Sequence, residues 1–163
     1  MKQRLLSLLA SMAFVLAGAT AHAATPRAID AQDIQDIRTV FLQQAAAATA
    51  HDIAAFERVF TSAPQGSPYE VTFVARAYQY WSKQAVIEHF KETFKGVWKF
   101  EPDPATIRVM PLTADSAEIY APTQVTFGTS DATAKTSPFL VCEIAVRTPE
   151  GWRIATIIPV PAQ

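Results

Sequence analysis

Glu143 is the residue of this sequence whose position most clearly suggests chemistry. It stands between Cys142 and Ile144 in a stretch of alternating residues, 138–147, whose period of two predicts a strand. A carboxylate there either faces an apolar cavity, where burial raises its pKa and suits it to act as a general base, or faces water or a salt-bridge partner. The residues that share its face are apolar at one end and charged at the other, so both alternatives remain open.

Aromatic residues supply a second set of candidates. Tyr120 lies in a predicted strand, where it either directs its hydroxyl into a cavity or is an ordinary half-buried strand tyrosine. Tyr78, Tyr80, Trp81 and Trp98 flank a predicted helix, and they form either the mouth of an apolar pocket or core and rim packing. The alternation places Trp81 nearer the core. The candidate ligand-binding residues are Tyr80, Trp98, Tyr120 and Glu143, and the candidate catalytic residue is Glu143.

Metal and cofactor motifs are missing from the sequence. His51 and His89 stand in no H-x-H or H-x-x-x-H pair and have no cysteine nearby, so each is interpreted as a loop or helix-face residue and no metal site is predicted. The sequence has no G-x-S-x-G motif. Its five scattered glycines form neither a phosphate loop nor a dinucleotide fingerprint. No cofactor is therefore predicted.

The N-terminus has the pattern of a secretory signal peptide. Basic residues precede an apolar run over residues 5–17, and residues 21–23 (AHA) place small side chains where signal peptidase requires them. A membrane span would need about 20 apolar residues, more than this run supplies. We expect residues 1–23 to be removed before Ala24, which leaves a periplasmic or secreted protein with no membrane attachment.

Composition limits the remaining part, residues 24–163, to a single domain. A chain of 163 residues has the length of one hydrophobic core. Fourteen Lys and Arg residues against fifteen Asp and Glu leave no basic surplus, which argues against a nucleic-acid partner. Cys142 is the only cysteine, so it forms no intrachain disulfide, and we expect it to be buried as a small hydrophobic residue.

The pattern of residues changes from helical to strand-like along the chain, which is typical of an α+β fold. Asp30, Asp52 and Ser82 each precede an apolar stripe at helical spacing and are predicted to cap three helices. Period-two alternation runs from Glu70 to Trp81. Further strands are predicted at 97–100, 106–112, 117–127, 138–147 and 152–160. Short turns between them imply antiparallel pairing, and hence a curved sheet with the helices on one side.

This order of elements resembles the nuclear transport factor 2-like superfamily, in its SnoaL-like and ketosteroid-isomerase-like bacterial branches. The most specific matches are the hairpin turn at 151–154 (GWRI) and the strand opening at 115–118 (DSAE). Members usually carry Gly-Asp where this chain has His51-Asp52, so the aspartate matches and the glycine does not. The resemblance implies a cone: helices packed on a strongly curved sheet around an apolar cavity, often in a dimer paired through the sheet.

Two functions follow from this resemblance. One is an accessory or binding domain whose cavity holds a small apolar or aromatic molecule; the other is a cofactor-free isomerase, dehydratase or cyclase using general acid–base chemistry. The ketosteroid-isomerase-like enzymes need a carboxylate base with a tyrosine and a protonated carboxyl, and the sequence does not place such a trio, so binding is favoured. A dimeric module with a filled cavity is a third alternative. Apolar residues on both faces of 152–160 predict a homodimer.

Overall fold

The computed structural model describes residues 27–62, 70–76 and 78–162. The predicted signal peptide lies outside these residues. The helices are α1 (Ala31–Thr49), α2 (Ile53–Arg58) and α3 (Lys83–Thr93). The strands are β1 (Thr72–Ala75), β2 (Tyr78–Tyr80), β3 (Val97–Pro102), β4 (Arg108–Thr113), β5 (Ser116–Gly128), β6 (Lys135–Thr148) and β7 (Gly151–Pro161). The α+β class predicted from the sequence is confirmed.

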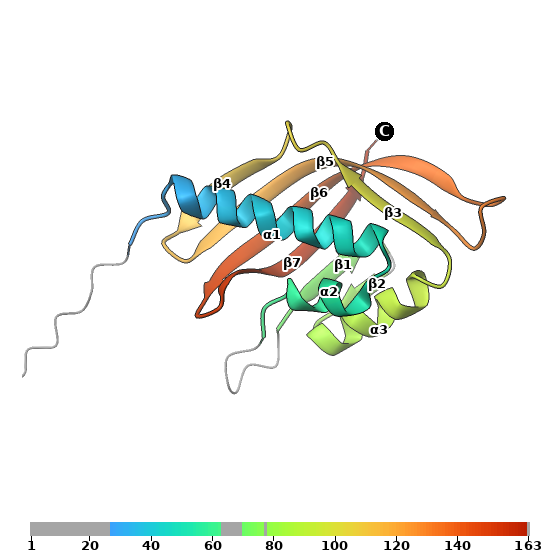
Figure 1. Cartoon of the computed structure of the whole chain (residues 1–163), viewed down its shortest axis with the longest axis horizontal. Helices are drawn as coiled ribbons and strands as arrows, with labels where there is room; N and C mark the ends of the chain where they lie inside the picture. The colour runs from blue at the N-terminus through green and yellow to red at the C-terminus, as the bar shows by residue number, and fades with distance from the viewer. Residues whose placement is uncertain (1–26, 63–69, 77, 163) are drawn as a thin grey trace, which may run out of the picture.

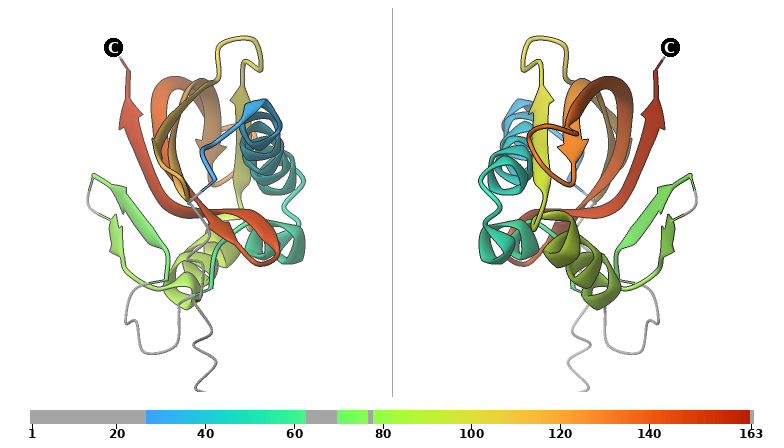
Figure 2. Two further views of the ribbon diagram at one scale, coloured as in Figure 1. Left: turned by 90° about the vertical axis from the view of Figure 1, so that its left-hand side faces the viewer. Right: turned by 90° about the vertical axis from the view of Figure 1, so that its right-hand side faces the viewer.

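In the described part of the chain the strands form one seven-stranded sheet in the order β2-β1-β7-β6-β5-β3, with β4 also paired to β5. All neighbouring strands are antiparallel except β1 and β7. The sheet curls around the side on which α1 lies, and α2 and α3 close one end of the hollow (Figure 1, Figure 2). The predicted curved sheet with helices on one side is therefore confirmed.

Side-chain caps explain where the helices begin. The carboxylate of Asp30 accepts a hydrogen bond from the backbone N–H of Asp33 at 2.9 Å, and the Asp33 carboxylate accepts one from the backbone N–H of Asp30 at 3.1 Å, completing a capping box. Asp52 caps α2, and Ser82 caps α3, as predicted. Each cap satisfies a backbone donor that the first helical turn leaves free.

The alternation from Glu70 to Trp81 is not a single strand, as the sequence pattern suggested, but the hairpin of β1 and β2. Arg76 at its turn has a φ of +47°, which reverses the chain. Phe73 and Tyr80, which alternation would put on opposite faces, are directly paired and their rings stack at 6.2 Å. The turn also moves Trp81 out of the predicted core, and its side chain is 49% exposed.

A buried carboxylate anchors the start of α1 to the sheet. Asp33 accepts hydrogen bonds from both terminal nitrogens of the Arg147 guanidinium, at 2.7 and 3.0 Å, and from the Trp152 indole at 3.2 Å. The guanidinium also stacks 4.6 Å from the centre of the Trp152 ring. The Arg147 hydrogen bonds hold the pKa of Asp33 well below its usual range, although burial opposes them. Ionised Asp33 therefore joins α1 to β6 and β7.

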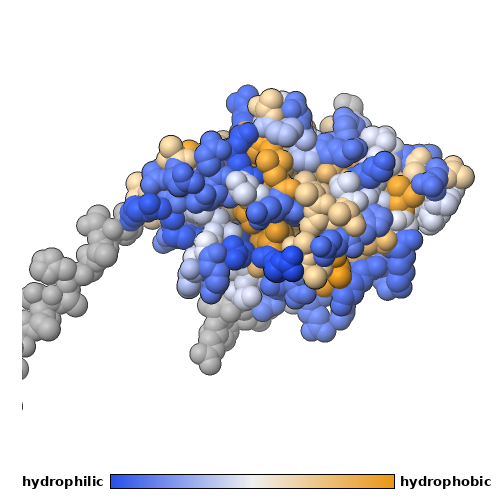
Figure 3. Space-filling model, viewed as in Figure 1, coloured by the Kyte–Doolittle hydropathy of each residue, from blue (hydrophilic) through white to orange (hydrophobic). Residues whose placement is uncertain are grey.

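The outer face of the sheet carries several exposed apolar side chains, among them Met110, Ile158 and Val160. Pairing of two chains through this face stays a prediction. Cys142 lies on this face and is half-buried rather than buried, because the core takes its neighbours Val141 and Glu143 instead. On the opposite side, which includes α1, hydrophilic residues cover most of the surface around a hydrophobic middle (Figure 3). No helix of the described ranges is long and apolar enough to cross a membrane.

We predict that Asp33→Asn lowers the free energy of unfolding at pH 7 by about 2 kcal/mol, because the partly buried Arg147 then loses its buried carboxylate partner and keeps only the exposed Asp115. A carboxylate with a depressed folded pKa stabilises the fold above its unfolded pKa of about 3.9, and this stabilisation is lost as the pH falls. The difference in free energy of unfolding between Asp33→Asn and the wild type should therefore narrow below about pH 4. Urea titrations of both proteins at pH 7 and pH 3 measure this difference.

The matched control is Asp36→Asn, which changes an exposed carboxylate on the same helix. Its free energy of unfolding should stay within about 0.5 kcal/mol of the wild-type value. Equal free energies of unfolding for Asp33→Asn and the control at pH 7 would show that the contact between Asp33 and Arg147 does not stabilise the fold.

Candidate functional site

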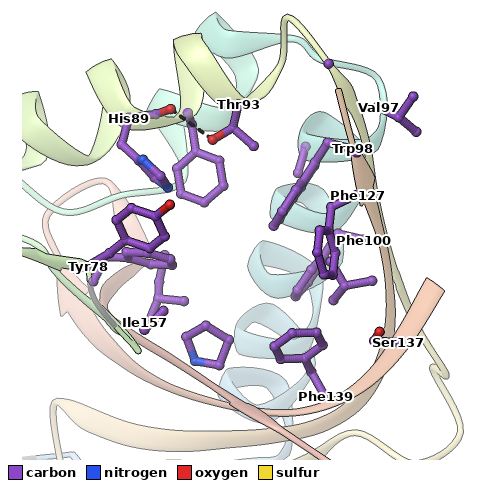
Figure 4. Close-up of a pocket in the computed structure, with 18 of the residues that line it drawn as sticks. Tyr78, His89, Thr93, Val97, Trp98, Phe100, Phe127, Ser137, Phe139 and Ile157 are labelled. Atoms are coloured by element: carbon purple, nitrogen blue, oxygen red, sulfur yellow. Dashed lines mark hydrogen bonds between the residues drawn. The ribbon is translucent and has the colours of Figure 1, made fainter. Parts of the chain in front are cut away.

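The hollow between the sheet and the helices contains a cavity of about 990 Å³. Side chains from α1, α2, α3 and six strands contribute to its wall, and Figure 4 shows His89 and Tyr78 on one side of the cavity and Trp98 and Phe127 on the other. The wall is mainly aromatic and includes Phe73, Tyr78, Phe90, Trp98, Phe100 and Phe139. The mouth is open to solvent, since the rings of Tyr78 and Phe127 are both about half exposed. This size and lining are typical of small-molecule sites.

Close backbone packing fixes the edge of the cavity at which β3 begins. A Cβ on Gly96 would stand 2.4 Å from the carbonyl oxygen of Gly128, so only glycine allows this approach. His51 has a φ of +56°, the left-handed conformation that favours glycine. Two contacts of the His51 ring offset the cost of this backbone conformation. Its Nε2 lies 3.0 Å from the carbonyl oxygen of Trp98, and the ring stacks on Phe94.

Glu143 and Gln44 form a buried pair against the floor of the hollow. Glu143 is 1% exposed, and its Oε1 accepts a hydrogen bond from Gln44 Nε2 at 2.8 Å. Burial raises the pKa of Glu143 to about 8, although the Gln44 hydrogen bond opposes the shift. The solvent-facing alternative for Glu143 is therefore wrong. The carboxyl does not itself line the cavity; Gln44 lines it and stands in front of Glu143.

Three buried polar atoms have no hydrogen-bond partner among the described residues: Gln44 Oε1, Glu143 Oε2 and Trp98 Nε1. Buried polar atoms in folded proteins are nearly always hydrogen-bonded, so each exception needs an explanation. Gln44 and Trp98 line the cavity, and Glu143 lies directly behind Gln44. The unpartnered atoms therefore belong to residues that line the cavity or lie directly behind its wall.

A second polar group lies where α3 meets the β1–β2 hairpin. The Tyr80 hydroxyl is 3.3 Å from His89 Nδ1, and the ring of His89 lies 4.9 Å from the rings of both Tyr78 and Tyr80. Burial lowers the pKa of His89, so the imidazole is neutral near pH 7. His89 lines the cavity and can accept or donate one proton there. No cluster of three potential metal ligands occurs within the described residues.

The structure brings together only part of the predicted ligand-binding set. Trp98 lines the cavity, whereas Tyr80 and Glu143 each touch a lining residue, His89 and Gln44, without lining it themselves. Tyr120 was assigned wrongly. It lies on the other face of β5, because the neighbouring Ile119 and Ala121 are fully buried and point inward.

The sequence reasoning missed Gln44 and His89. One signal for Gln44 was available, because it interrupts the apolar stripe that includes Phe41 and Ala48 on the first helix. A polar residue on a buried helix face requires a partner across the core. His89 carried no comparable signal, since its aromatic neighbours come mainly from the hairpin that the alternation concealed.

We predict that Glu143→Gln changes the pH dependence of stability. A glutamate whose folded pKa is raised to about 8 binds its proton more tightly when folded, so wild-type stability should fall as the pH rises from about 4.5 to about 8. The glutamine variant lacks this decline, so its stability relative to the wild type should grow over that range. Thermal melts from pH 5 to pH 8 measure the difference.

The matched control is Glu101→Gln, which changes an exposed glutamate on β3. Its profile of stability against pH should run parallel to that of the wild type. If the Glu143→Gln profile is also parallel to the wild type, Glu143 is ionised in the fold and the buried acid described above does not exist.

Solved structures of similar shape come from several bacteria. A Novosphingobium aromaticivorans protein, for which aromatic ring hydroxylase activity has been suggested, is 17% identical with a TM-score of 0.70, over 83% of this chain and 92% of that one. A Streptomyces avermitilis protein of the NTF2-like family, suggested to be a dehydratase, is 13% identical with a TM-score of 0.68, over 80% of this chain and 97% of that one.

An NTF2-like superfamily protein of Salmonella enterica is 14% identical with a TM-score of 0.69, over 81% of this chain and 93% of that one. At these identities the likeness concerns the fold alone. Comparison with curated proteins finds no significant match. Residues 37–157 match the SnoaL-like domain family. As the resemblance in the sequence predicted, the chain belongs to the SnoaL-like domain family, and it shares the fold of NTF2-like proteins.

Proposed function

We propose that this protein binds a small apolar or aromatic molecule in the cavity. The observation that carries the proposal is the aromatic wall around about 990 Å³ of space. Ligand pockets of this kind measure about 300–1,000 Å³ and combine apolar walls with few polar groups. Aromatic rings contribute large contact areas at little cost in conformational entropy, and they suit flat ligands in particular.

The distribution of charge supports an uncharged ligand. Among the described lining residues, the charged side chains belong to Arg76, Glu92 and Lys95, and all three are exposed at the rim. The inner wall offers uncharged polar groups, those of Gln44, Thr93, Ser137, Trp98 and neutral His89. An ion placed deep in the cavity would lose its hydration without gaining a counter-charge, which is unfavourable.

An acid–base enzyme acting in the same cavity is the second candidate. It is favoured by His89, a neutral imidazole on the wall whose orientation is held by Tyr80. Glu143 supports it less, because a general base must come within hydrogen-bond distance of its substrate and Gln44 stands in between. The wall therefore supports binding more directly than turnover.

We also propose that the protein is exported, on the basis of the signal-peptide pattern in residues 1–23. Edman sequencing of protein recovered from the periplasm or medium of the expressing cells should begin at Ala24. Recovery of the full chain from the membrane fraction or the cytoplasm would contradict this proposal.

We predict that Ser137→Trp weakens ligand binding by at least about fivefold, because the new ring occupies space in the cavity that the ligand needs. The probe is N-phenyl-1-naphthylamine, an uncharged aromatic amine whose fluorescence rises in apolar surroundings. Its dissociation constant is measured by fluorescence titration of the purified wild type and variant.

Thr136→Trp is the matched control, since Thr136 is the adjacent residue of β6 and is exposed on the other face. It should bind the probe as the wild type does. Equal binding by all three proteins would show that the probe enters elsewhere, and no binding by the wild type would remove the proposed function.

A further inference from the structure

Among the uncharged polar groups of the cavity wall, the imidazole of His89 is both accessible and held in one orientation. Gln44 directs its N–H behind the wall, and Gln44 Oε1 and Trp98 Nε1 are buried. The Thr93 hydroxyl donates to the carbonyl oxygen of His89 at 3.0 Å and is thereby used. The Ser137 hydroxyl has no hydrogen-bond partner among the described residues that would fix its direction.

Tyr80 holds the imidazole from the side away from the cavity. Its hydroxyl lies 3.3 Å from His89 Nδ1, and Tyr80 does not line the cavity. The other ring nitrogen, Nε2, points in a widely different direction. Nε2 has no hydrogen-bond partner among the described residues, and it is not one of the buried unpartnered atoms, so it is accessible. Since His89 lines the cavity and its ring lies beside Tyr78 there (Figure 4), Nε2 is the ring nitrogen open to a ligand.

The contact with Tyr80 also decides which nitrogen of His89 carries the proton. Within the described part of the chain the Tyr80 hydroxyl has no acceptor other than Nδ1. A phenol donates more strongly than its oxygen accepts, because the aromatic ring draws on the oxygen lone pair. Burial lowers the pKa of His89, so the imidazole is neutral near pH 7. When Nδ1 accepts, a neutral imidazole has its proton on Nε2 and presents one N–H donor.

We infer that the ligand is an uncharged ring compound with a carbonyl oxygen that accepts a hydrogen bond from His89 Nε2–H. This inference rests on the proposed function, because it names the ligand class for the same cavity. A carbonyl oxygen is a strong neutral acceptor and brings no donor that would need a partner. His89 lies beside Tyr78, whose half-exposed ring borders the mouth, so the ligand lies with its carbonyl toward α3 and its apolar part against the aromatic wall.

The test compares two probes of one shape by calorimetric titration of the wild type at about pH 7.5. One is 2-acetylnaphthalene, and the other is 2-isopropenylnaphthalene, in which a CH₂ group replaces the carbonyl oxygen. The protein is injected into the probe, because the hydrocarbon is sparingly soluble. A wall without a donor would favour the hydrocarbon, since the ketone loses more hydration on binding. We expect the wild type instead to bind the ketone at least about threefold more tightly.

A variant of His89 assigns this preference to the imidazole. His89→Phe keeps a ring and removes the donor, so it should bind the hydrocarbon more tightly than the ketone. Lys91→Phe is the matched control, because it places the same side chain at an exposed position of α3 outside the cavity lining. It should keep the wild-type preference for the ketone.

A variant of Tyr80 tests its role as a positioning residue. A long-range ¹H–¹⁵N spectrum of the imidazole reports which nitrogen is protonated, and in the wild type it should show the proton of His89 on Nε2. Tyr80→Phe should populate both tautomers and reduce the preference for the ketone. The control Tyr120→Phe, which removes a hydroxyl on the outer face of the sheet, should change neither. A wild-type proton on Nδ1 would overturn the inference.

Equal binding of the two probes by the wild type, or tighter binding of the hydrocarbon, would overturn this inference and leave the proposed function standing, because the apolar cavity alone would then account for the affinity. Failure of both probes to bind would overturn both. The comparison in the wild type needs no variant, so it decides the question even if His89→Phe does not fold.

Discussion

Two buried polar contacts between α1 and β6 determine where the helix lies on the sheet, and the cavity depends on that placement. Asp33 meets Arg147 at one end, and Gln44 meets Glu143 further along. Asp33 and Gln44 are about three helical turns apart, so they point the same way, and Glu143 and Arg147 share one face of their strand. Apolar packing alone would let the helix slide, whereas two directional contacts allow one position.

The helix ends before the sheet does, and the remaining space becomes the cavity. Thr49, at the end of α1, exchanges hydrogen bonds with the backbone of Phe100 in β3, and the chain then turns away through His51. Strands β5 and β6 continue past this point (Figure 1), and their side chains Phe127 and Ser137 face α3 across the hollow. Aromatic rings line the gap without filling it.

The sequence predicted the helices and strands that depend on neighbouring residues. It did not predict side-chain environments that depend on a partner far away in the chain. N-cap residues such as Asp52 predicted where the helices begin. Apolar residues at a spacing of 3.6 predicted helices and at a spacing of two predicted the long strands, because these signals act within a few residues. Which face of a strand is buried is decided by what packs on it, so Tyr120 was assigned to the wrong face and Cys142 to the core. Glu143 was singled out correctly as unusual, but its partner Gln44 lies 99 residues away.

The central claim is that the space under α1 and α3 is a ligand site and not a consequence of packing. A nuclear magnetic resonance titration of the ¹⁵N-labelled protein with 2-naphthol tests it most directly. We expect the resonances of the Trp98 indole N–H and the Gln44 side-chain amide to shift on saturation, while those of outer-face residues such as Tyr120 do not. Shifts confined to the outer face, or no shifts at a saturating concentration, would contradict it.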